Sequence, residues 1–205
     1  MTPPTTSSQD NTSLASVFER IYRDKVWGEG SGPGSDPVQA KPYLDYLLNL
    51  IADKEINQVL DVGCGDQRIY RGELAVRKNA WWWCIDVAPN LCGDYDCIEI
   101  HDCDMERVDL VIIKDVLQHL PHAENLRILR KAMEAKWVLV TNDWITTGNK
   151  RDIEAGDYRP VDVLLPPYGY AAQDSFGWGS IPFSKLAVLL KGGQQLPDQP
   201  PTVSS

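Results

Sequence analysis

The middle of the chain alternates short apolar runs with turns and with one amphipathic stretch. Residues 121–135 carry leucine and methionine at helical spacing after a proline, and we predict a helix there. The remaining runs have the length of buried strands: NQVLDV (57–62), AWWWCIDV (80–87), CIEIHD (97–102), RVDLVIIKD (107–115), KWVLVTND (136–143), PVDVLL (160–165) and SKLAVLLK (184–191). Strands that alternate with helices form βαβ units, so we predict a doubly wound, Rossmann-like α/β fold. Its seven-stranded sheet would be mostly parallel, with 160–165 and 184–191 paired as an antiparallel edge.

Two amphipathic stretches precede the first predicted strand. Apolar residues recur at helical spacing in 13–25 and again in 38–52, and both patterns predict helices. The loop between them, VWGEGSGPGSDP (26–37), contains four glycines and two prolines. We expect this loop to act as a lid over the site, with Trp27 packing on a ligand or on the core. A surface connection between two helices is the alternative.

Composition and charge limit the kinds of partner. The 205 residues include 43% hydrophobic and 24% charged positions, as expected for one soluble domain, which we place at residues 13–191. Residues 1–12 and 192–205 are rich in polar residues and proline, and we expect them to be disordered. The net charge of −9 makes nucleic acid an unfavourable partner.

Cysteine usage and the N-terminus indicate a cellular compartment. The five cysteines are odd in number and irregularly spaced, which is typical of a reducing environment. The N-terminus lacks the basic and apolar regions of a signal peptide, and no apolar run reaches the roughly 20 residues that span a bilayer. We therefore expect a cytoplasmic protein without a membrane span.

A glycine-rich turn, in QVLDVGCGDQR, follows the first predicted strand. In an open α/β sheet, ligands bind beyond the carboxyl ends of the strands, so this turn is a candidate cofactor site. A dinucleotide fingerprint would need a third glycine, where this chain has Arg68, and the lysine of a phosphate-binding loop is also missing. Asp61 and Asp66 place negative charge on either side of Gly63 and Gly65, which is unfavourable for a pyrophosphate.

S-adenosylmethionine suits these acids because it carries a sulfonium and an ammonium and no phosphate. Asp61 is placed to anchor the ammonium, and the glycines let the backbone approach the methionine end. Asp86, 21 residues after Gly65, is placed to accept hydrogen bonds from two ribose hydroxyls, and Asp102 from the adenine amino group. A tight turn that binds no ligand is the alternative. The candidate cofactor-binding residues are Trp27, Asp61, Gly63, Cys64, Gly65, Asp86, Val87, Asp102 and Lys114.

Two motifs resemble those of a known family. VLDVGCGD resembles motif I of the class I S-adenosylmethionine-dependent methyltransferases, and CIDVAPN resembles their strand-two motif, within a resemblance that covers residues 16–190. Three further stretches, IYRDKVWGEGSGPGS, KDVLQHLPHAENLRIL and NKRDIEAGDYRPVDV, resemble a small subgroup associated with glycan and sugar biosynthesis. Relatives often have an aromatic residue where this chain has Gln67. The resemblance implies the class I methyltransferase fold and S-adenosylmethionine as cofactor, with S-adenosylhomocysteine as product.

Methyl transfer to a hydroxyl benefits from a group that removes the hydroxyl proton. Asp115 ends the fourth predicted strand and His119 follows four residues later, so either could be that base, or Asp115 could orient His119. Packing or capping at the following helix is the alternative for His119. The candidate substrate-binding residues are Asp66, Asp143, Asp157, Tyr158 and Arg159. A structural turn in which Arg159 pairs with an acid is the alternative for the last of these segments.

The sequence does not require a metal. The histidines and cysteines lack the spacing of a zinc site. A divalent ion on Asp115, Asn142 and Asp143 is permitted by their places at the strand ends but is not demanded.

The function predicted from the sequence is S-adenosylmethionine-dependent methyl transfer to a hydroxyl of a sugar or glycan. A first alternative is an O- or N-methyltransferase of a natural product or another small molecule. A binding module without turnover is a second. An NAD-dependent oxidoreductase is a third, which Arg68 disfavours.

Overall fold

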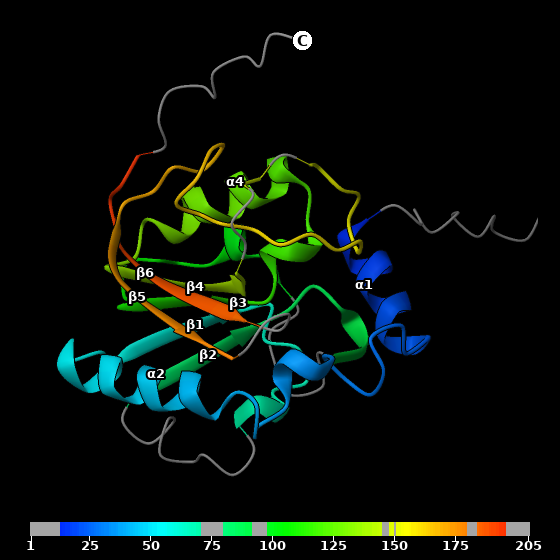
Figure 1. Ribbon diagram of the computed structural model, residues 1–205, viewed down its shortest axis with the longest axis horizontal. Helices are drawn as coiled ribbons and strands as arrows, with labels where there is room; N and C mark the ends of the chain where they lie inside the picture. The colour runs from blue at the N-terminus through cyan, green and yellow to red at the C-terminus, as the bar shows by residue number, and fades with distance from the viewer. Residues whose placement is uncertain are drawn as a thin grey trace, which may run out of the picture.

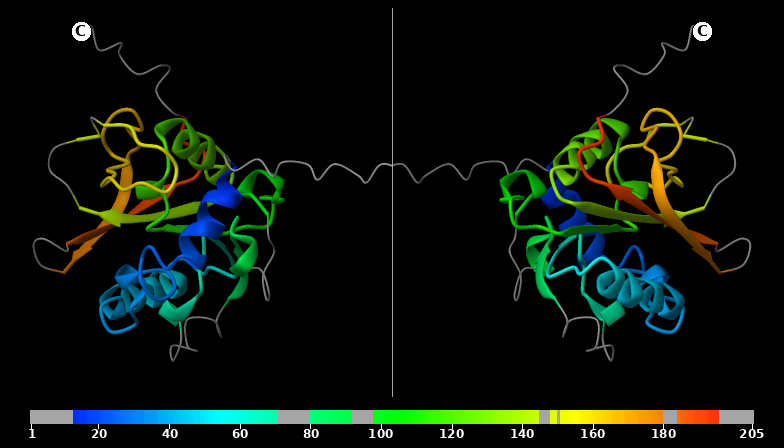
Figure 2. Two further views of the ribbon diagram at one scale, coloured as in Figure 1. Left: turned by 90° about the vertical axis from the view of Figure 1, so that its right-hand side faces the viewer. Right: turned by 90° about the vertical axis from the view of Figure 1, so that its left-hand side faces the viewer.

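The computed structural model describes residues 13–70, 80–91, 98–144, 148–149, 151–179 and 184–195. Its centre is a six-stranded sheet with helices on both faces (Figure 1). The described α-helices are α1 (Leu14–Arg23), α2 (Lys41–Asp53) and α4 (His122–Ala132). The strands are β1 (Gln58–Val62), β2 (Trp81–Ile85), β3 (Leu110–Lys114), β4 (Trp137–Asp143), β5 (Ala172–Trp178) and β6 (Lys185–Lys191). The side views in Figure 2 show α2 and α4 on opposite sides of the sheet.

The strands follow the order β2-β1-β3-β4-β6-β5. β1 pairs in parallel with β2 and β3, and β3 pairs in parallel with β4. β6 is antiparallel to both of its neighbours, β4 and β5. The predicted doubly wound, mostly parallel α/β sheet is thus confirmed: five of the seven predicted strands are present in the described residues, and the sixth strand, β5, was not predicted.

Two of the predicted strands are wrong. In place of a strand at 97–102, Ile100–Asp102 form a 3-10 helix, η4, whose i→i+3 backbone hydrogen bonds are incompatible with extended strand pairing. The segment 160–165 forms turns, because the Asp162 carboxylate accepts a hydrogen bond of 2.9 Å from the backbone two residues later. The antiparallel partner of β6 is therefore β5, a strand of mostly exposed residues without a continuous apolar run.

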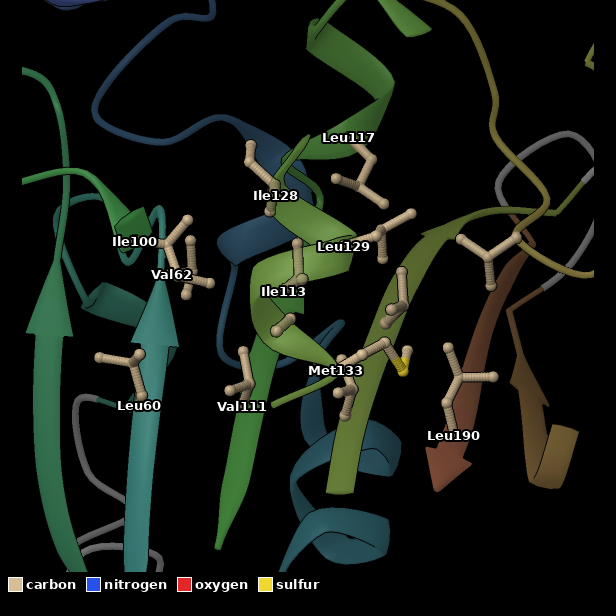
Figure 3. Close-up of a cluster of buried hydrophobic side chains, with 14 of the residues drawn as sticks. Leu60, Val62, Ile100, Val111, Ile113, Leu117, Ile128, Leu129, Met133 and Leu190 are labelled. Carbon is tan, nitrogen blue, oxygen red and sulfur yellow. The ribbon is translucent and has the colours of Figure 1, made fainter. Parts of the chain in front are cut away.

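Each face of the sheet has its own apolar core. Successive side chains of a strand point to opposite faces. Leu60 and Val111 therefore pack with Leu129 of α4, as Figure 3 shows, whereas Val59 and Leu110 pack with the residues of α2. Burying each such side chain contributes about 2 kcal/mol, so both helix layers are held firmly against the strands.

The sequence predicts disorder at both ends of the chain. Residues 1–12 and 196–205 lie outside the described part. At the start of the expected tail, Gly192 donates to the Lys136 carbonyl at 2.9 Å and Gly193 to the Met133 carbonyl at 2.8 Å, so these residues are attached to the fold. Among the described helices, none combines the length and the apolar character needed to cross a membrane.

Candidate cofactor and active site

A cavity of about 980 Å³ opens at the carboxyl ends of the parallel strands. Its wall combines the turns that follow β1, β2 and β3, the end of β4 and the loop at 26–37. Most of the residues singled out from the sequence line it: Trp27, Asp61, Gly63, Cys64, Gly65, Asp86, Val87, Lys114, Asp115, His119, Asp143 and Tyr158. Four do not belong to the wall: Asp66, Asp102, Asp157 and Arg159.

The turn after β1 requires its two glycines. Gly63 has φ of 67° and Gly65 has φ of 58°, in the left-handed region that side chains disfavour. A Cβ on Gly63 would lie 2.5 Å from Cγ2 of Val116, and one on Gly65 would collide with the hydroxyl of Ser31. The turn therefore presents bare backbone to the cavity, as the sequence predicted.

Two buried acids border this turn. Asp61 is 3% exposed and accepts a hydrogen bond of 2.9 Å from the hydroxyl of Tyr70. Asp86 accepts from the N–H of Gly65 and from the N–H of Ala88, both at 2.9 Å, so it ties the turn after β1 to the turn after β2. Burial raises the pKa of Asp86, and the backbone hydrogen bonds partly offset that effect.

The glycine-rich loop at 26–37 lies against the cavity and is fixed at several points. Lys114 donates to the Gly34 carbonyl at 2.8 Å, and Ser31 donates to Asp66 at 3.2 Å. Asp66, expected to bind substrate, therefore anchors this loop instead. Trp27 lines the cavity, with its ring centroid 4.6 Å from that of His119. These contacts fit the predicted lid position; opening and closing of the loop stay a prediction.

Charged side chains form a row along the cavity wall. Asp115 pairs with Lys114 at 2.5 Å and with Lys185 at 2.7 Å, and Lys185 also pairs with Asp143 at 2.5 Å. Tyr158 donates its hydroxyl proton to Asp143. Burial alone would raise the pKa of Asp115, but the two ammonium groups hold it below the ordinary value. Asp115 is thus a stable anion and a poor proton acceptor.

His119 has the geometry of a general base. Its Nδ1 lies 2.9 Å from the backbone carbonyl of Asp157, which can only accept, so Nδ1 carries the proton. The other nitrogen, Nε2, then has a lone pair, which faces the side-chain amide nitrogen of Gln118 at 3.5 Å. Burial lowers the pKa of His119, so the imidazole is neutral near pH 7. The sequence left open whether Asp115 orients His119. In the structure the orienting partner is the backbone carbonyl of Asp157.

Lys185 makes metal binding at the strand ends less favourable. The sequence permits a divalent ion on Asp115, Asn142 and Asp143. The ammonium of Lys185 bridges the two carboxylates instead, and a divalent ion would have to displace it. The ammonium of Lys185 therefore balances the negative charge of Asp115 and Asp143.

A second acidic group, of Glu99, His101 and Glu124, also lines the cavity. One ligand atom from each lies within 4.8 Å of the others, a spacing that could hold a metal ion. Arg127 donates to Glu99 at 2.5 Å and to Glu124 at 2.7 Å, so a guanidinium already neutralises both carboxylates. This group is explained as an ion-pair cluster that joins α4 to η4.

Two further predictions about the site are corrected by the structure. Asp102 is exposed and outside the cavity wall, because the expected third strand is a 3-10 helix that turns the side chain to solvent. Arg159 is 5% exposed and donates to the carbonyls of Leu120 at 2.8 Å and Arg151 at 2.9 Å, with Asp152 at 3.5 Å. Arg159 therefore stabilises a structural turn and pairs with an acid, which was the alternative to substrate binding. Asp157 contributes only its backbone.

Sequence analysis did not single out Lys185, Trp178 or Gln118, which also line the cavity. Lys185 is the second residue of a predicted strand, but its neighbours depend on pairing with β4 and β5, whereas the apolar pattern predicted 160–165 as the antiparallel partner. Trp178 lies at the end of β5, which the pattern missed. Gln118 directly precedes His119 and accepts a hydrogen bond of 3.2 Å from the backbone of Asp143, so it joins the histidine segment to β4.

Comparison with known proteins gives a fold match without a sequence match. The sequence matches no protein-family model and no curated protein. The structure resembles that of magnesium protoporphyrin IX methyltransferase from Synechocystis PCC 6803 with bound S-adenosylhomocysteine. Its TM-score is 0.62 and its identity 14%, over 89% of this chain and 100% of that one.

Two further solved structures resemble this chain. The S-adenosylmethionine-dependent methyltransferase SibL has a TM-score of 0.51 at 18% identity, over 76% of this chain and 56% of that one. The N-terminal domain of EvdMO1, with S-adenosylhomocysteine bound, has a TM-score of 0.50 at 12% identity, over 73% and 80%. At these identities the likeness concerns the fold. The chain therefore has the fold of the S-adenosylmethionine-dependent methyltransferases.

Proposed function

We propose that this protein is an S-adenosylmethionine-dependent methyltransferase that methylates a hydroxyl group of a small polar acceptor. The observation that carries the proposal is one continuous cavity at the strand ends. It joins a glycine turn with two buried acids to a neutral histidine whose Nε2 has a lone pair. The first part suits a cationic nucleoside and the second part suits proton removal from a hydroxyl.

The residues around the turn fit the proposed cofactor. The Asp61 carboxylate, buried at the end of β1, would face the ammonium of the methionine moiety. The positive-φ glycines leave room for the same moiety against the backbone. Asp86, which ends β2 and accepts backbone hydrogen bonds from Gly65 and Ala88, would take the ribose hydroxyls.

The mechanism that we propose places the proton on His119. Bound S-adenosylmethionine would supply a methyl group already activated by its sulfonium. His119 Nε2 accepts the hydroxyl proton as the acceptor oxygen forms its bond to the methyl carbon and the carbon–sulfur bond breaks. The Asp157 carbonyl stabilises the resulting imidazolium through Nδ1–H. Trp27, whose ring lies in a tilted contact 4.6 Å from the imidazole, would limit the access of water to His119 when the cavity is occupied.

A sugar hydroxyl is the acceptor that we propose, in agreement with the subgroup resemblance of the sequence. Its support is the density of polar groups beside His119, where Asp115, Lys185, Asp143 and Tyr158 share one wall. A phenolic hydroxyl of a natural product is the second candidate, because Trp27 and other aromatic rings also face the cavity.

Calorimetric titration with S-adenosylhomocysteine and with NAD tests the cofactor. We expect only S-adenosylhomocysteine to bind. Asp86→Asn should weaken it about tenfold or more, since it removes a charged hydrogen-bond acceptor. Asp102→Asn, which alters an exposed acid outside the cavity, is the matched control and should bind normally. Binding of NAD without S-adenosylhomocysteine would refute the proposed function.

A further inference from the structure

The chain that leads to Arg159 pairs with the backbone around His119. The N–H of Gly156 donates to the carbonyl of His119 at 2.9 Å. The N–H of Arg159 donates to the carbonyl of Gln118, also at 2.9 Å. Between these two hydrogen bonds lies the peptide group whose carbonyl belongs to Asp157, and this carbonyl accepts from Nδ1 of His119 at 2.9 Å. The direction of that single peptide group therefore decides which nitrogen of His119 carries the proton.

Tyr158 directly follows this peptide group, and its side chain makes two contacts of its own. Its ring lies near the imidazole of His119, with centroids 5.9 Å apart and an interplanar angle of 50°. Its hydroxyl donates to the carboxylate of Asp143 at the end of β4. Lys185 pairs with the same carboxylate at 2.5 Å, so the acceptor of the hydroxyl is itself held in place. The side chain of Tyr158 thus joins β4 to the peptide group that meets His119.

The placement of the Tyr158 ring depends on its hydroxyl. Tyr158 is 50% exposed, so burial of its ring contributes little to the core. Burial and the hydrogen bond to Asp143 raise the pKa of Tyr158, so the hydroxyl keeps its proton near neutral pH and remains a donor. A half-exposed ring with a hydrogen bond to a carboxylate is fixed by that hydrogen bond more than by packing. Loss of the hydroxyl should therefore free the ring and, with it, the adjoining peptide group.

We propose that Tyr158 is a positioning residue for the base His119. This inference rests on the proposed function and deepens it. Anchored on Asp143, Tyr158 holds the Asp157 carbonyl toward Nδ1, which keeps the proton there and leaves the lone pair on Nε2. If this carbonyl turned away, the neutral imidazole would exchange between its two tautomers, and an Nε2 that carries the proton cannot accept another. Tyr158 acts through His119 and needs no contact with the acceptor.

Long-range proton–nitrogen NMR of the histidine rings tests the proposal without an acceptor. The chain has three histidines, and the signals that disappear in His119→Gln are those of His119. Such spectra distinguish the protonated from the unprotonated ring nitrogen and follow the titration of each ring. In the wild type at about pH 8 we expect the proton on Nδ1. Because burial lowers the pKa of His119, its titration midpoint should lie below the ordinary value of about 6.5.

Tyr158→Phe keeps the ring and removes the hydroxyl. At about pH 8 its spectra should show the proton of His119 shared between Nδ1 and Nε2, and its midpoint should move toward about 6.5 as water reaches the imidazole. Tyr158→Ala should change both in the same direction and by more, with a midpoint raised by about half a pH unit or more. Three charged groups face His119 and remain in both variants: Asp115, Asp143 and Lys185.

Tyr46→Phe is the matched control. The hydroxyl of Tyr46 donates to the carboxylate of Asp174 at 3.0 Å, and Tyr46 lies outside the cavity wall. Tyr46→Phe therefore breaks the same kind of hydrogen bond and should leave the His119 signals as in the wild type.

Two results would overturn the proposal, whatever the loss of stability in urea. The first is a tautomer and midpoint of His119 that Tyr158→Phe leaves unchanged, and the second is an equal change in Tyr46→Phe. Either would show that Tyr158 is merely structural. Calorimetry with S-adenosylhomocysteine separates this failure from that of the proposed function. A wild type that does not bind it would refute the proposed function, whereas binding together with unchanged His119 signals overturns the positioning role alone.

Discussion

Replacing Lys185 by methionine would test the charged row directly. Methionine keeps most of the apolar stem and removes the ammonium. In the structure the ammonium lies 2.7 Å from an oxygen of Asp115 and 2.5 Å from an oxygen of Asp143. Without it, these two carboxylate oxygens would lie within about 5 Å of each other with no cation between them.

The expected loss of stability follows from that separation. Two like charges about 5 Å apart repel by ~3 kcal/mol at an effective dielectric constant of 20. Removal of one member of a buried ion pair costs about 3–5 kcal/mol in general. Because Lys114 still pairs with Asp115 at 2.5 Å, we expect the lower end, about 3 kcal/mol near pH 7.

The sign of the pH dependence follows from Asp115. The ammonium groups overcome the effect of burial and depress its pKa in the folded wild type. Its contribution to stability is therefore present above the unfolded pKa of about 3.9 and is lost as the pH falls through the folded value. In Lys185→Met the pKa of Asp115 rises, so protonation relieves the repulsion earlier. The deficit relative to wild type should be largest at about pH 7–8 and should shrink toward about pH 4.

Urea denaturation over this pH range measures the effect, with Lys191→Met as the control. Lys191 lies on the same strand but is exposed at its other end, and its replacement should change stability by less than about 0.5 kcal/mol. Millimolar Mg²⁺ should restore part of the stability of Lys185→Met and have no effect on the wild type. A deficit below about 1 kcal/mol at neutral pH, or one that is constant with pH, would refute the electrostatic reasoning.

Three further variants test the base, the buried arginine and the glycine turn. His119→Gln should lower kcat by about 10²–10⁴-fold with normal binding of S-adenosylhomocysteine. Because burial lowers the pKa of His119, the wild-type kcat/KM should rise with pH through a midpoint below the ordinary histidine value of about 6.5. Unchanged turnover would exclude His119 as the base. Arg159→Lys should lose about 2–3 kcal/mol in urea denaturation, since it keeps the charge but not the fork that binds the backbone carbonyls, and a changed acceptor KM without that loss would restore a substrate role. Gly63→Ala should abolish cofactor binding in calorimetry because its Cβ would meet Val116, whereas Gly28→Ala, at φ of 84° with open space around it, controls for backbone strain alone.

The proposed cofactor half of the site was accessible from sequence because its residues are local to the strand ends. Asp61 and Asp86 each end an apolar run, and parallel strands bring such ends to one edge whatever their order. The steric demand on Gly63 also comes from a short segment. The predicted position of Asp102 was wrong because the apolar run before it is short. Such a run does not distinguish a strand from the 3-10 helix that the segment forms.

The orientation of His119 could not be predicted from the sequence. His119 could be named as a base from its residue type and its place after β3. Its orientation, however, comes from the backbone carbonyl of Asp157, and any residue at that position would supply the same carbonyl. The sequence therefore drew attention to the Asp157 side chain, which lies outside the cavity wall, and not to the group that fixes the tautomer.

The proposed acceptor half of the site depends on strand pairing that a local pattern does not encode. A lysine at the start of an apolar run is ordinarily a solvent-facing end. Lys185 becomes part of the site because β6 runs antiparallel between β4 and β5, which sets it opposite both Asp143 and Trp178. A parallel β6 would bring the other end of the strand, Lys191, to this edge, and the bridging ammonium would have no fixed place. The direction of one strand thus determines whether the carboxylate pair is neutralised by the chain or left to attract an ion.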